Sequence, residues 1–322
     1  MTPARTVINT LDLSGAPEAV AAVEAVGKLI SLPAERDLVL ARIGEADAYL
    51  ASASVRIDEE FLAHASRLRL IGSPSTGTDH MDLDAIRAAG VEMYDIAREF
   101  DLINSFTATS ELAFGLLLSL VRHLPPAFVA AKQGDWARER YSGFQLAGKT
   151  LAVLGLGRLG KITARIGNGF GMSVIACDPA DVSAPDVEMV SFDELLDQAD
   201  VLSIHLHLTS ETDGLIDARC LAQMKPSALL LNTSRGRVVD EYALLEALKE
   251  RTIAGAGLDV VDGEWLNDDK LQAHPLLEYA RANGNLLITP HIGGATSESI
   301  YGARVFMARR VADYLQAPEN TR

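Results

Sequence analysis

The sequence predicts an α/β fold in which two domains are each built around a parallel sheet. Its 322 residues are enough for two separate hydrophobic cores. Short apolar runs alternate with helical patterns along the chain, which is typical of parallel strands connected by helices. One of these runs, residues 151–154, leads into a glycine-rich turn that opens a helical pattern. The fold class follows from these three observations together.

The first block of alternation covers residues 6–103. Alanine-rich helical stretches separate its candidate strands, at residues 7–8, 48–50, 70–72 and 91–94. This pattern predicts a small, doubly wound, flavodoxin-like domain.

The second block begins with a long helix over residues 105–122, which Pro125 and Pro126 bring to an end. Its candidate strands are residues 151–154, 174–177, 201–205, 228–232, 257–260 and 286–289. The last helical stretch, residues 297–315, has no place in that sheet, so we expect it to return to the first domain. The predicted domains are therefore residues 1–103 plus 293–322 for the substrate and residues 104–292, inserted between them, for a cofactor. Ligands of such sheets bind in a cleft at the carboxyl ends of the strands.

Composition excludes several classes of protein. The net charge is −15, from 44 acidic and 29 basic residues without a Lys/Arg run, which argues against binding to nucleic acid or an anionic membrane. Cys177 and Cys220 are far apart and set among apolar residues, so neither a disulfide framework nor a metal site is expected. No signal-peptide core is found in residues 1–10, and the apolar residues 112–121 are too few to span a bilayer. We therefore expect a soluble cytoplasmic protein.

The glycine-rich turn has the spacing of a dinucleotide site. Gly155 would allow the tight turn, Gly157 would let the backbone approach a pyrophosphate, and Gly160 would let the helix pack on the sheet. The next apolar run ends in Asp178, which would accept hydrogen bonds from a ribose and repel the extra phosphate of NADP. The pattern predicts a Rossmann domain that binds NAD. The alternative is a glycine loop that only packs a helix on a strand.

Three polar residues follow the ends of late strands, where folds of this class place their active sites: Arg235, Glu264 and His291. An arginine can bind the carboxylate and carbonyl of a 2-oxo acid, a histidine can give the alkoxide its proton, and a carboxylate can hold the imidazole. Each residue alone has an ordinary explanation, as a surface arginine, a solvated loop acid and a turn histidine. Their conjunction favours hydride transfer.

Residues 232–240, 254–260 and 289–294 together resemble signatures of the D-isomer-specific 2-hydroxyacid dehydrogenases. Residues 76–82 and 104–122 also resemble that family's substrate-carboxylate loop and interdomain helix, and the chain is most similar to the phosphoglycerate dehydrogenase-like branch without a regulatory domain. The resemblance implies that Arg235 binds substrate, that His291 is the general acid and base, and that Glu264 pairs with His291.

The same resemblance implies further contacts and an assembly. The cofactor contacts are Thr76, Gly155, Gly157, Arg158, Leu159, Gly160, Asp178, His205, Thr233, Ser234, Asp259 and Gly293, and the substrate contacts are Ser75, Thr76, Gly77 and Arg235. Asp178 has the alternative role of a turn cap before Pro179, and Asp259 that of a strand-end cap. The family also implies a homodimer formed through the cofactor domain.

Several positions depart from the family pattern. Trp265 follows the predicted acid where the family usually has proline, and His207 also stands in place of a proline. Phosphoglycerate dehydrogenases bind their charged substrate with arginines at positions that match Ser52 and Ser73 here. Arg98 could replace that charge; the alternative is a solvated arginine paired with Glu99 or Asp101. These changes argue against a doubly charged substrate.

The sequence therefore predicts an NAD-dependent dehydrogenase that interconverts a 2-oxo acid and a D-2-hydroxy acid. A 3-phosphoglycerate dehydrogenase is the closest alternative. Two other classes stay open on the same scaffold: an NAD(H)-sensing interaction protein and an enzyme that uses tightly held NAD without net oxidation.

Overall fold

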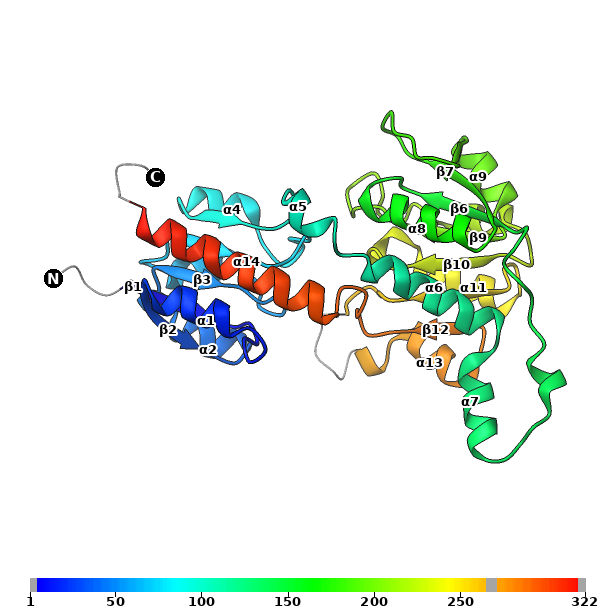
Figure 1. Ribbon diagram of the computed structural model, residues 1–322, viewed down its shortest axis with the longest axis horizontal. Coiled ribbons are helices and arrows are strands. Elements are labelled where there is room, and N and C mark those ends of the chain that lie inside the picture. Colours follow the sequence, from blue (N-terminus) through cyan, green and yellow to red (C-terminus); the bar gives the residue numbers. More distant parts are fainter. Residues whose placement is uncertain (1–4, 265–270, 318–322) are drawn as a thin grey trace. The chain divides into compact units, whose positions relative to one another are not determined.

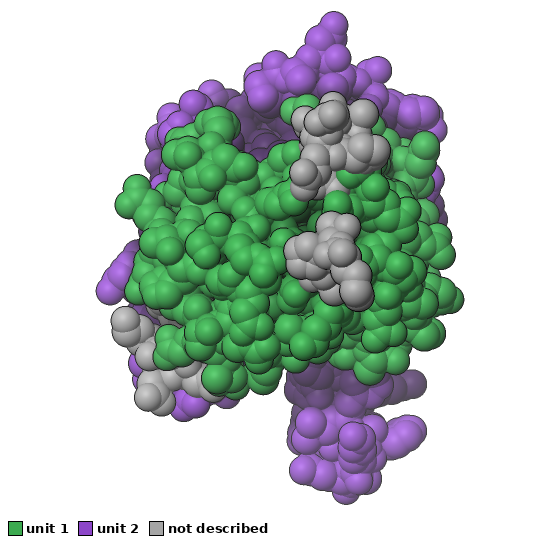
Figure 2. Space-filling view, turned by 90° about the vertical axis from the view of Figure 1, so that its left-hand side faces the viewer, with its two compact units in different colours: residues 1–106, 296–322 green, residues 107–295 purple. Residues whose placement is uncertain are grey.

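The computed structural model describes residues 5–264 and 271–317 (Figure 1). The chain forms two compact units, which are coloured separately in Figure 2. Unit 1 consists of Met1–Phe106 and Thr296–Arg322, and unit 2 of Thr107–Ala295. These divisions fall a few residues after the domain limits expected from the sequence.

Unit 1 contains a five-stranded sheet in which all neighbouring strands are parallel. The strand order is β2-β1-β3-β4-β5, with bounds β1 Arg5–Asn9, β2 Gly27–Ser31, β3 Ala48–Leu50, β4 Leu70–Gly72 and β5 Glu92–Tyr94. Its helices are α1 Pro17–Glu24, α2 Arg36–Leu40, α3 Glu59–His64, α4 Leu83–Ala88, α5 Phe100–Ile103 and α14 Ser297–Gln316, with a 3₁₀ turn at Ile43–Glu45.

The two faces of this sheet bury separate cores, because successive strand residues point to opposite sides. Val7 and Leu50 belong to the core that includes α1 and α14, whereas Ile8 and Tyr49 belong to the core that includes α3 and α4. Helix α14, drawn in red in Figure 1, packs on α1, β3 and β4. It lies so close to β4 that a side chain at Gly72 would meet Val311 at 2.8 Å. The C-terminal helix therefore completes the core of the N-terminal unit.

Unit 2 contains a seven-stranded sheet, again with parallel neighbours throughout. The order is β12-β11-β10-β9-β6-β7-β8, with bounds β6 Thr150–Leu154, β7 Ser173–Cys177, β8 Glu188–Met189, β9 Val201–Ile204, β10 Leu229–Asn232, β11 Gly255–Leu258 and β12 Leu286–Ile288. The helices are α6 Ala108–Val121, α7 Leu124–Lys132, α8 Arg158–Gly169, α9 Phe192–Gln198, α10 Ala218–Gln223, α11 Glu241–Lys249 and α13 Pro275–Ala282, with 3₁₀ turns at Arg138–Tyr141 and Gly236–Val238.

Helices cover both faces of the larger sheet, as the buried clusters show. Helices α6 and α8 pack on the face that carries Leu229 and Leu231. Helices α9, α10 and α11 pack on the face that carries Leu230. Because both faces are covered, the central strands are mostly apolar, which is why they could be located from the sequence.

The register of the sheet brings the ends of three strands into line. Asn232 of β10 pairs with Leu258 of β11, which pairs with Ile288 of β12. The residues that follow these strand ends therefore lie at one edge of the sheet, and they include the predicted Arg235, Glu264 and His291.

Two strands were not expected from the sequence, β2 and β8. Both are edge strands, and most of their residues are partly or fully exposed. An edge strand does not need an apolar run to cover two faces, so neither gives the signal that identifies the buried strands.

Two further observations concern the whole of the described chain. Among the described residues no single helix is long and apolar enough to cross a membrane, although the bent pair Phe100–Val121 and Leu124–Lys132 passes by length and composition. Cys177 and Cys220 are free thiols, and the latter is buried.

Candidate active site

The glycine-rich turn connects β6 to α8 and depends on two of its glycines for packing. Gly155 has a φ of +92°, and a Cβ there would lie 2.7 Å from the carbonyl oxygen of His205. A Cβ at Gly160 would lie 2.0 Å from the carbonyl oxygen of Gly155. Larger residues at either position would push the turn away from its neighbours.

Gly157 has a different role. A Cβ at Gly157 would meet no atom within 4 Å, so packing inside the protein does not require glycine there. This residue is the N-cap of α8 and provides no side-chain hydrogen bond to the first turn of the helix. Backbone N–H groups at a helix N-terminus attract anions, and the open space lets a ligand approach them. The turn therefore fits the pyrophosphate of a dinucleotide.

Asp178 follows β7 and lies beside this turn. Its Oδ2 accepts a hydrogen bond from the Leu156 N–H at 2.7 Å, and its Oδ1 accepts one from the Ala180 N–H at 2.8 Å. The turn-capping role considered from the sequence is thus present. Each carboxylate oxygen has two lone pairs, so these bonds leave acceptor capacity for a ribose.

Two other predicted cofactor residues lie at the ends of neighbouring strands. The Nε2 atom of His205 is 2.9 Å from the Ser203 hydroxyl, and burial lowers the pKa of His205 to about 4. The imidazole is therefore neutral near pH 7. The hydroxyl of Thr233, after β10, is buried without a hydrogen-bond partner among the described residues. Buried polar groups in native proteins normally have a partner, so an orphaned hydroxyl here is consistent with a ligand contact.

The turn that carries Arg235 is held by a side chain that the sequence interpretation did not select. The side chain is that of Asn232, which is 1% exposed. Its Oδ1 accepts hydrogen bonds from the Ser234 N–H at 3.0 Å and from the Ser234 hydroxyl at 2.8 Å. Its Nδ2 donates to the Arg235 carbonyl at 2.9 Å. The guanidinium of Arg235 donates to the Ser234 carbonyl at 2.8 Å. A polar residue at the end of a buried strand was the available signal for Asn232.

His291 and Glu264 form a direct pair. The Nδ1 atom of His291 is 2.8 Å from Oε1 of Glu264, and the two side chains are 29% and 12% exposed. A carboxylate at this distance accepts a hydrogen bond from Nδ1 and fixes the orientation of the ring.

The turn that carries His291 is built around Asp259. Its Oδ1 accepts from the Thr289 hydroxyl at 2.6 Å and the Ile292 N–H at 2.9 Å, and its Oδ2 accepts from the Gly293 N–H at 2.7 Å. His291 sits between these partners with a φ of +52°, an uncommon conformation for a residue with a side chain. Such strain persists only where surrounding contacts enforce it, and it is concentrated at functional sites. Asp259 thus has the strand-end capping role, with 1% of its surface exposed.

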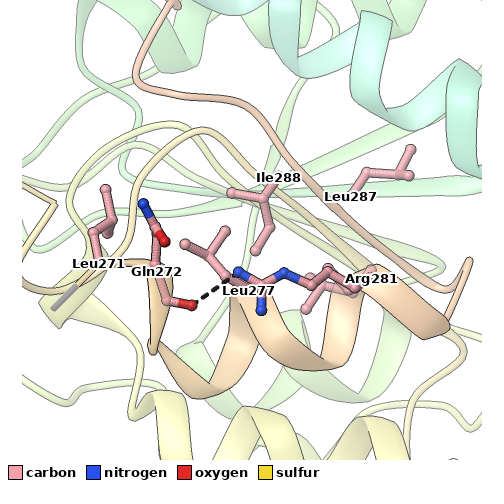
Figure 3. A pocket seen from close by; sticks show the side chains of 8 residues that line it. Leu271, Gln272, Leu277, Arg281, Leu287 and Ile288 are labelled. Carbon is pink, nitrogen blue, oxygen red and sulfur yellow. Dashed lines mark hydrogen bonds between the residues drawn. The ribbon is translucent and has the colours of Figure 1, made fainter. Parts of the chain in front are cut away.

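A cavity of about 200 Å³ adjoins the pair and is lined by Glu264, His291 and apolar side chains that include Leu271, Leu277 and Ile288. The same three apolar residues also line a second pocket of about 500 Å³ between β12 and α13 (Figure 3). None of the predicted site residues lines that second pocket, whose polar side chains are Gln272 and Arg281.

The predicted substrate residues Ser75, Thr76 and Gly77 belong to unit 1, in the loop that follows β4. The Ser75 hydroxyl accepts from the Gly77 N–H at 3.2 Å, and Thr76 is exposed. These residues therefore form a local turn at the carboxyl end of the unit 1 sheet.

Four positions noted as departures from the family pattern have varied surroundings. Ser73 is fully buried, and its hydroxyl has no partner among the described residues, whereas Arg98 is exposed. The exposed His207 accepts a hydrogen bond from the Thr212 hydroxyl at 2.6 Å through its carbonyl oxygen, which ties its loop together. Trp265 lies outside the described residues.

The geometry of unit 2 combines a helix N-terminus open to an anion, an arginine turn and a carboxylate–histidine pair at one edge of one sheet. These are the parts needed to bind a dinucleotide and to transfer a proton beside it.

Comparisons with known proteins agree with this geometry. Residues 114–293 match the model of the D-isomer specific 2-hydroxyacid dehydrogenase NAD binding domain, and residues 11–101 match the catalytic domain of the same family. A D-3-phosphoglycerate dehydrogenase of Mycobacterium bovis is 37% identical over 269 residues, which are 82% of this chain and 48% of that protein. The chain thus spans about half the length of that relative.

Two further relatives are covered over most of their length. A glyoxylate reductase of Thermococcus litoralis is 34% identical over 288 residues, which are 86% of this chain and 82% of that protein. The crystal structure of a D-lactate dehydrogenase from Aquifex aeolicus, complexed with NAD and lactic acid, has a TM-score of 0.82 and 28% identity, covering 97% of this chain and 96% of the other. The two-unit α/β architecture is therefore that of these dehydrogenases.

Proposed function

Because the chain belongs to the D-isomer specific 2-hydroxyacid dehydrogenase family, we propose that it is an NAD-dependent oxidoreductase that interconverts a 2-oxo acid and a D-2-hydroxy acid. The observation that carries this proposal is the 2.8 Å contact between His291 and Glu264 at the ends of β12 and β11. The pair lies at the same sheet edge as the glycine turn that fits a dinucleotide.

His291 is the proton donor and acceptor in this proposal. Glu264 contacts Nδ1, and we assign the exchange of a proton with the substrate oxygen to Nε2, the other ring nitrogen. In reduction the imidazolium protonates the developing alkoxide, and in oxidation the neutral ring removes the hydroxyl proton. The Glu264 carboxylate keeps the ring in the same orientation in both directions.

Arg235 binds the substrate carboxylate and carbonyl oxygen, since a guanidinium can donate two parallel hydrogen bonds to oxygen atoms. We assign Ser75, Thr76 and Gly77 to the substrate carboxylate as well. Bound NAD(H) supplies or accepts the hydride.

The residues that would hold NAD(H) surround the open turn. Backbone N–H groups of the glycine-rich turn would bind the pyrophosphate, together with those of Arg158 and Leu159, the first two residues of α8. Asp178 would bind the ribose and disfavour NADP. Thr233, Ser234, His205, Asp259, Gly293 and Thr76 complete the proposed set of cofactor contacts.

The substrate we favour is a 2-oxo acid with a single negative charge. Ser52 and Ser73 stand at the positions matched to the arginines that recognise phosphorylated substrates in phosphoglycerate dehydrogenases, and Ser73 is fully buried. The net charge of −15 also supports a small molecule rather than nucleic acid or a membrane as the partner.

We also propose a cytoplasmic homodimer formed by unit 2. Free cysteines support a reducing compartment. Large apolar side chains are exposed on and after α7, with Phe128 63%, Val129 55% and Trp136 82% exposed, and exposed apolar patches of this kind often mark interfaces. Light scattering during size-exclusion chromatography would report a monomer mass if this proposal is wrong.

The test of the activity is NADH consumption with a panel of 2-oxo acids: glyoxylate, hydroxypyruvate, pyruvate, branched-chain and aromatic oxo acids, and phosphohydroxypyruvate. We expect turnover with one of the singly charged acids and D-configuration of the product. Phosphohydroxypyruvate as the best substrate would instead favour a 3-phosphoglycerate dehydrogenase. If no acid of the panel is turned over although fluorescence shows that NADH binds, the NAD(H)-sensing alternative would be favoured.

A further inference from the structure

Outside the proposed catalytic residues, Glu241 makes two contacts that link distant parts of unit 2. Glu241 is the first residue of α11, and its side chain is 16% exposed. Its Oε1 accepts a hydrogen bond from the Asp262 N–H at 2.7 Å, and its Oε2 is 3.0 Å from Nε2 of His274. One carboxylate therefore binds Asp262 and His274, which are 12 positions apart in the sequence.

In the contact between His274 and Glu241, the histidine ring is the hydrogen-bond donor. Nδ1 of His274 accepts from the Leu276 N–H at 3.3 Å and so caps the N-terminus of α13. Because Nδ1 is an acceptor in this cap, Nε2 is the ring atom that donates to Glu241. His274 thus connects the start of α11 to the start of α13.

The two points that Glu241 holds lie on either side of Glu264. Asp262 precedes it by two residues, and Gly263 between them has a φ of +71°, so the chain reverses direction just before the acid. Glu264 therefore follows a turn whose position depends on Asp262, and His274 acts on that turn through its contact with Glu241.

The position of Glu241 is in turn fixed by the arginine turn. A Cβ on Gly236, the residue after Arg235, would lie 2.4 Å from the Asp262 nitrogen, so that turn lies directly against the Val261–Asp262 peptide. The short 3₁₀ turn Gly236–Val238 then leads into α11. Helix α11 and the arginine turn thus form one continuous support for the segment that carries Glu264.

We propose that Glu241 and His274 are positioning residues whose mutual contact and bond to Asp262 hold Glu264 against His291. This inference rests on the function proposed above for the Glu264–His291 pair. A cavity of about 470 Å³ is lined by Glu241, His274, Asp262 and Gly263, so Asp262 and Gly263 have space to shift when the contact is broken.

The test uses two variants of the full chain and one control. Glu241→Ala removes both contacts, whereas His274→Asn removes only the contact with Glu241, because asparagine also caps helices but is too short to reach that carboxylate. For each variant we expect kcat/KM for the 2-oxo acid to fall about tenfold while the NADH dissociation constant stays unchanged. Glu246→Gln, on the same helix in an exposed pair with Lys249, should behave as wild type.

A double-mutant cycle with Glu264→Gln separates positioning from general loss of structure. If Glu241 and His274 act through Glu264, their substitution in the Glu264→Gln background changes kcat/KM no further, and each single variant shifts the pH–rate profile in the same direction as Glu264→Gln. Equal losses in both backgrounds would overturn the inference while leaving the proposed function intact.

A different outcome would identify a failure of the proposed function. If Glu264→Gln has wild-type kinetics and an unchanged pH–rate profile, Glu264 is not part of the catalytic pair, and the inference falls with it. If Glu241→Ala does not fold, His274→Asn completes the same cycle, since it preserves the cap of α13 and the Asp262 contact.

Discussion

Two turns at the carboxyl edge of the unit 2 sheet are stabilised in opposite ways. In the turn after β6, Gly155 to Gly160, the Leu156 N–H donates to Asp178, but a Cβ on Gly157 would meet nothing within 4 Å. The turn after β12, Thr289 to Gly293, is filled by Asp259, which accepts three hydrogen bonds from it. The first turn leaves open space at Gly157, at the N-terminus of α8, for a ligand, whereas the second is occupied by the Asp259 carboxylate.

The difference indicates that the first turn serves cofactor binding and the second serves catalysis. A turn whose backbone donors are open gains its stabilising partners only when an anion binds, so its sequence affects affinity more than folding. A turn saturated by a buried carboxylate is rigid before any ligand arrives, and it can keep His291 in a strained backbone conformation against Glu264. Substitutions in the two turns should therefore separate binding from catalysis.

The largest effect is expected from His291→Gln. Glutamine has a comparable size but cannot exchange a proton near neutral pH, so kcat should fall by about 10²–10⁴-fold. NADH affinity, measured by fluorescence titration, should stay unchanged because the glycine turn is intact. A parallel loss of NADH binding would contradict the separation of binding from catalysis. The control is His64→Gln, on the surface of unit 1.

Asp259→Asn should have the next largest effect. Asparagine keeps one acceptor oxygen but turns an N–H₂ group toward backbone donors, so the bonds to Ile292 or Gly293 are lost. Hydrogen bonds to charged groups contribute about 1.5–3 kcal/mol each, and we expect the free energy of unfolding to fall by about 3 kcal/mol, with a loss of kcat.

Urea denaturation measures this change. Asp82→Asn is the matched control, since Asp82 caps α4 in unit 1 and asparagine caps helices equally well. Similar stability losses in both variants would show that Asp259 is no more than an ordinary cap.

A smaller effect on binding is expected from Gly157→Ala. The added methyl meets nothing in the protein, so the free energy of unfolding should change little, but the methyl occupies the path of the pyrophosphate. We expect about tenfold weaker NADH binding.

Gly160→Ala provides the contrast within the same turn. Its methyl would meet the Gly155 carbonyl oxygen at 2.0 Å, so this variant should lose stability in thermal unfolding. Gly157→Ala with wild-type NADH affinity would show that the open space is not the pyrophosphate site.

The smallest effect concerns pH and His205, whose carbonyl oxygen lies against the glycine turn. Burial lowers the pKa of His205 to about 4 from its ordinary value of 6.5, so the unfolded chain binds the proton more readily between these values. Stability therefore rises with pH across this window, by about 1 kcal/mol from pH 5.5 to 7.5 for this group. In His205→Gln this part of the pH dependence should disappear in urea denaturation; an unchanged slope would show that His205 is accessible to solvent.

Sequence reasoning located the buried strands of both sheets because strands covered on two faces require continuous apolar runs. It missed β2 and β8, which are edge strands and carry no such requirement. In the site it selected Arg235, Glu264 and His291 by their place after strand ends, but it did not select Asn232, Thr289 or Glu241. Thr289 and Glu241 bond to groups of other segments, which the sequence does not bring together, whereas Asn232 bonds within its own turn.

The sequence by itself determined what local physics enforces: the alternation of strands and helices, the glycine turn with its acid after the next strand, and the polar residues at strand ends. Tertiary structure decided which of these groups meet. Glu264 and His291, 27 residues apart, come within 2.8 Å because β11 and β12 pair in parallel register, and Asp259 reaches the Gly293 N–H, 34 residues away, for the same reason. Side-chain contacts between strand ends depend on register, and register is set by packing of the whole sheet.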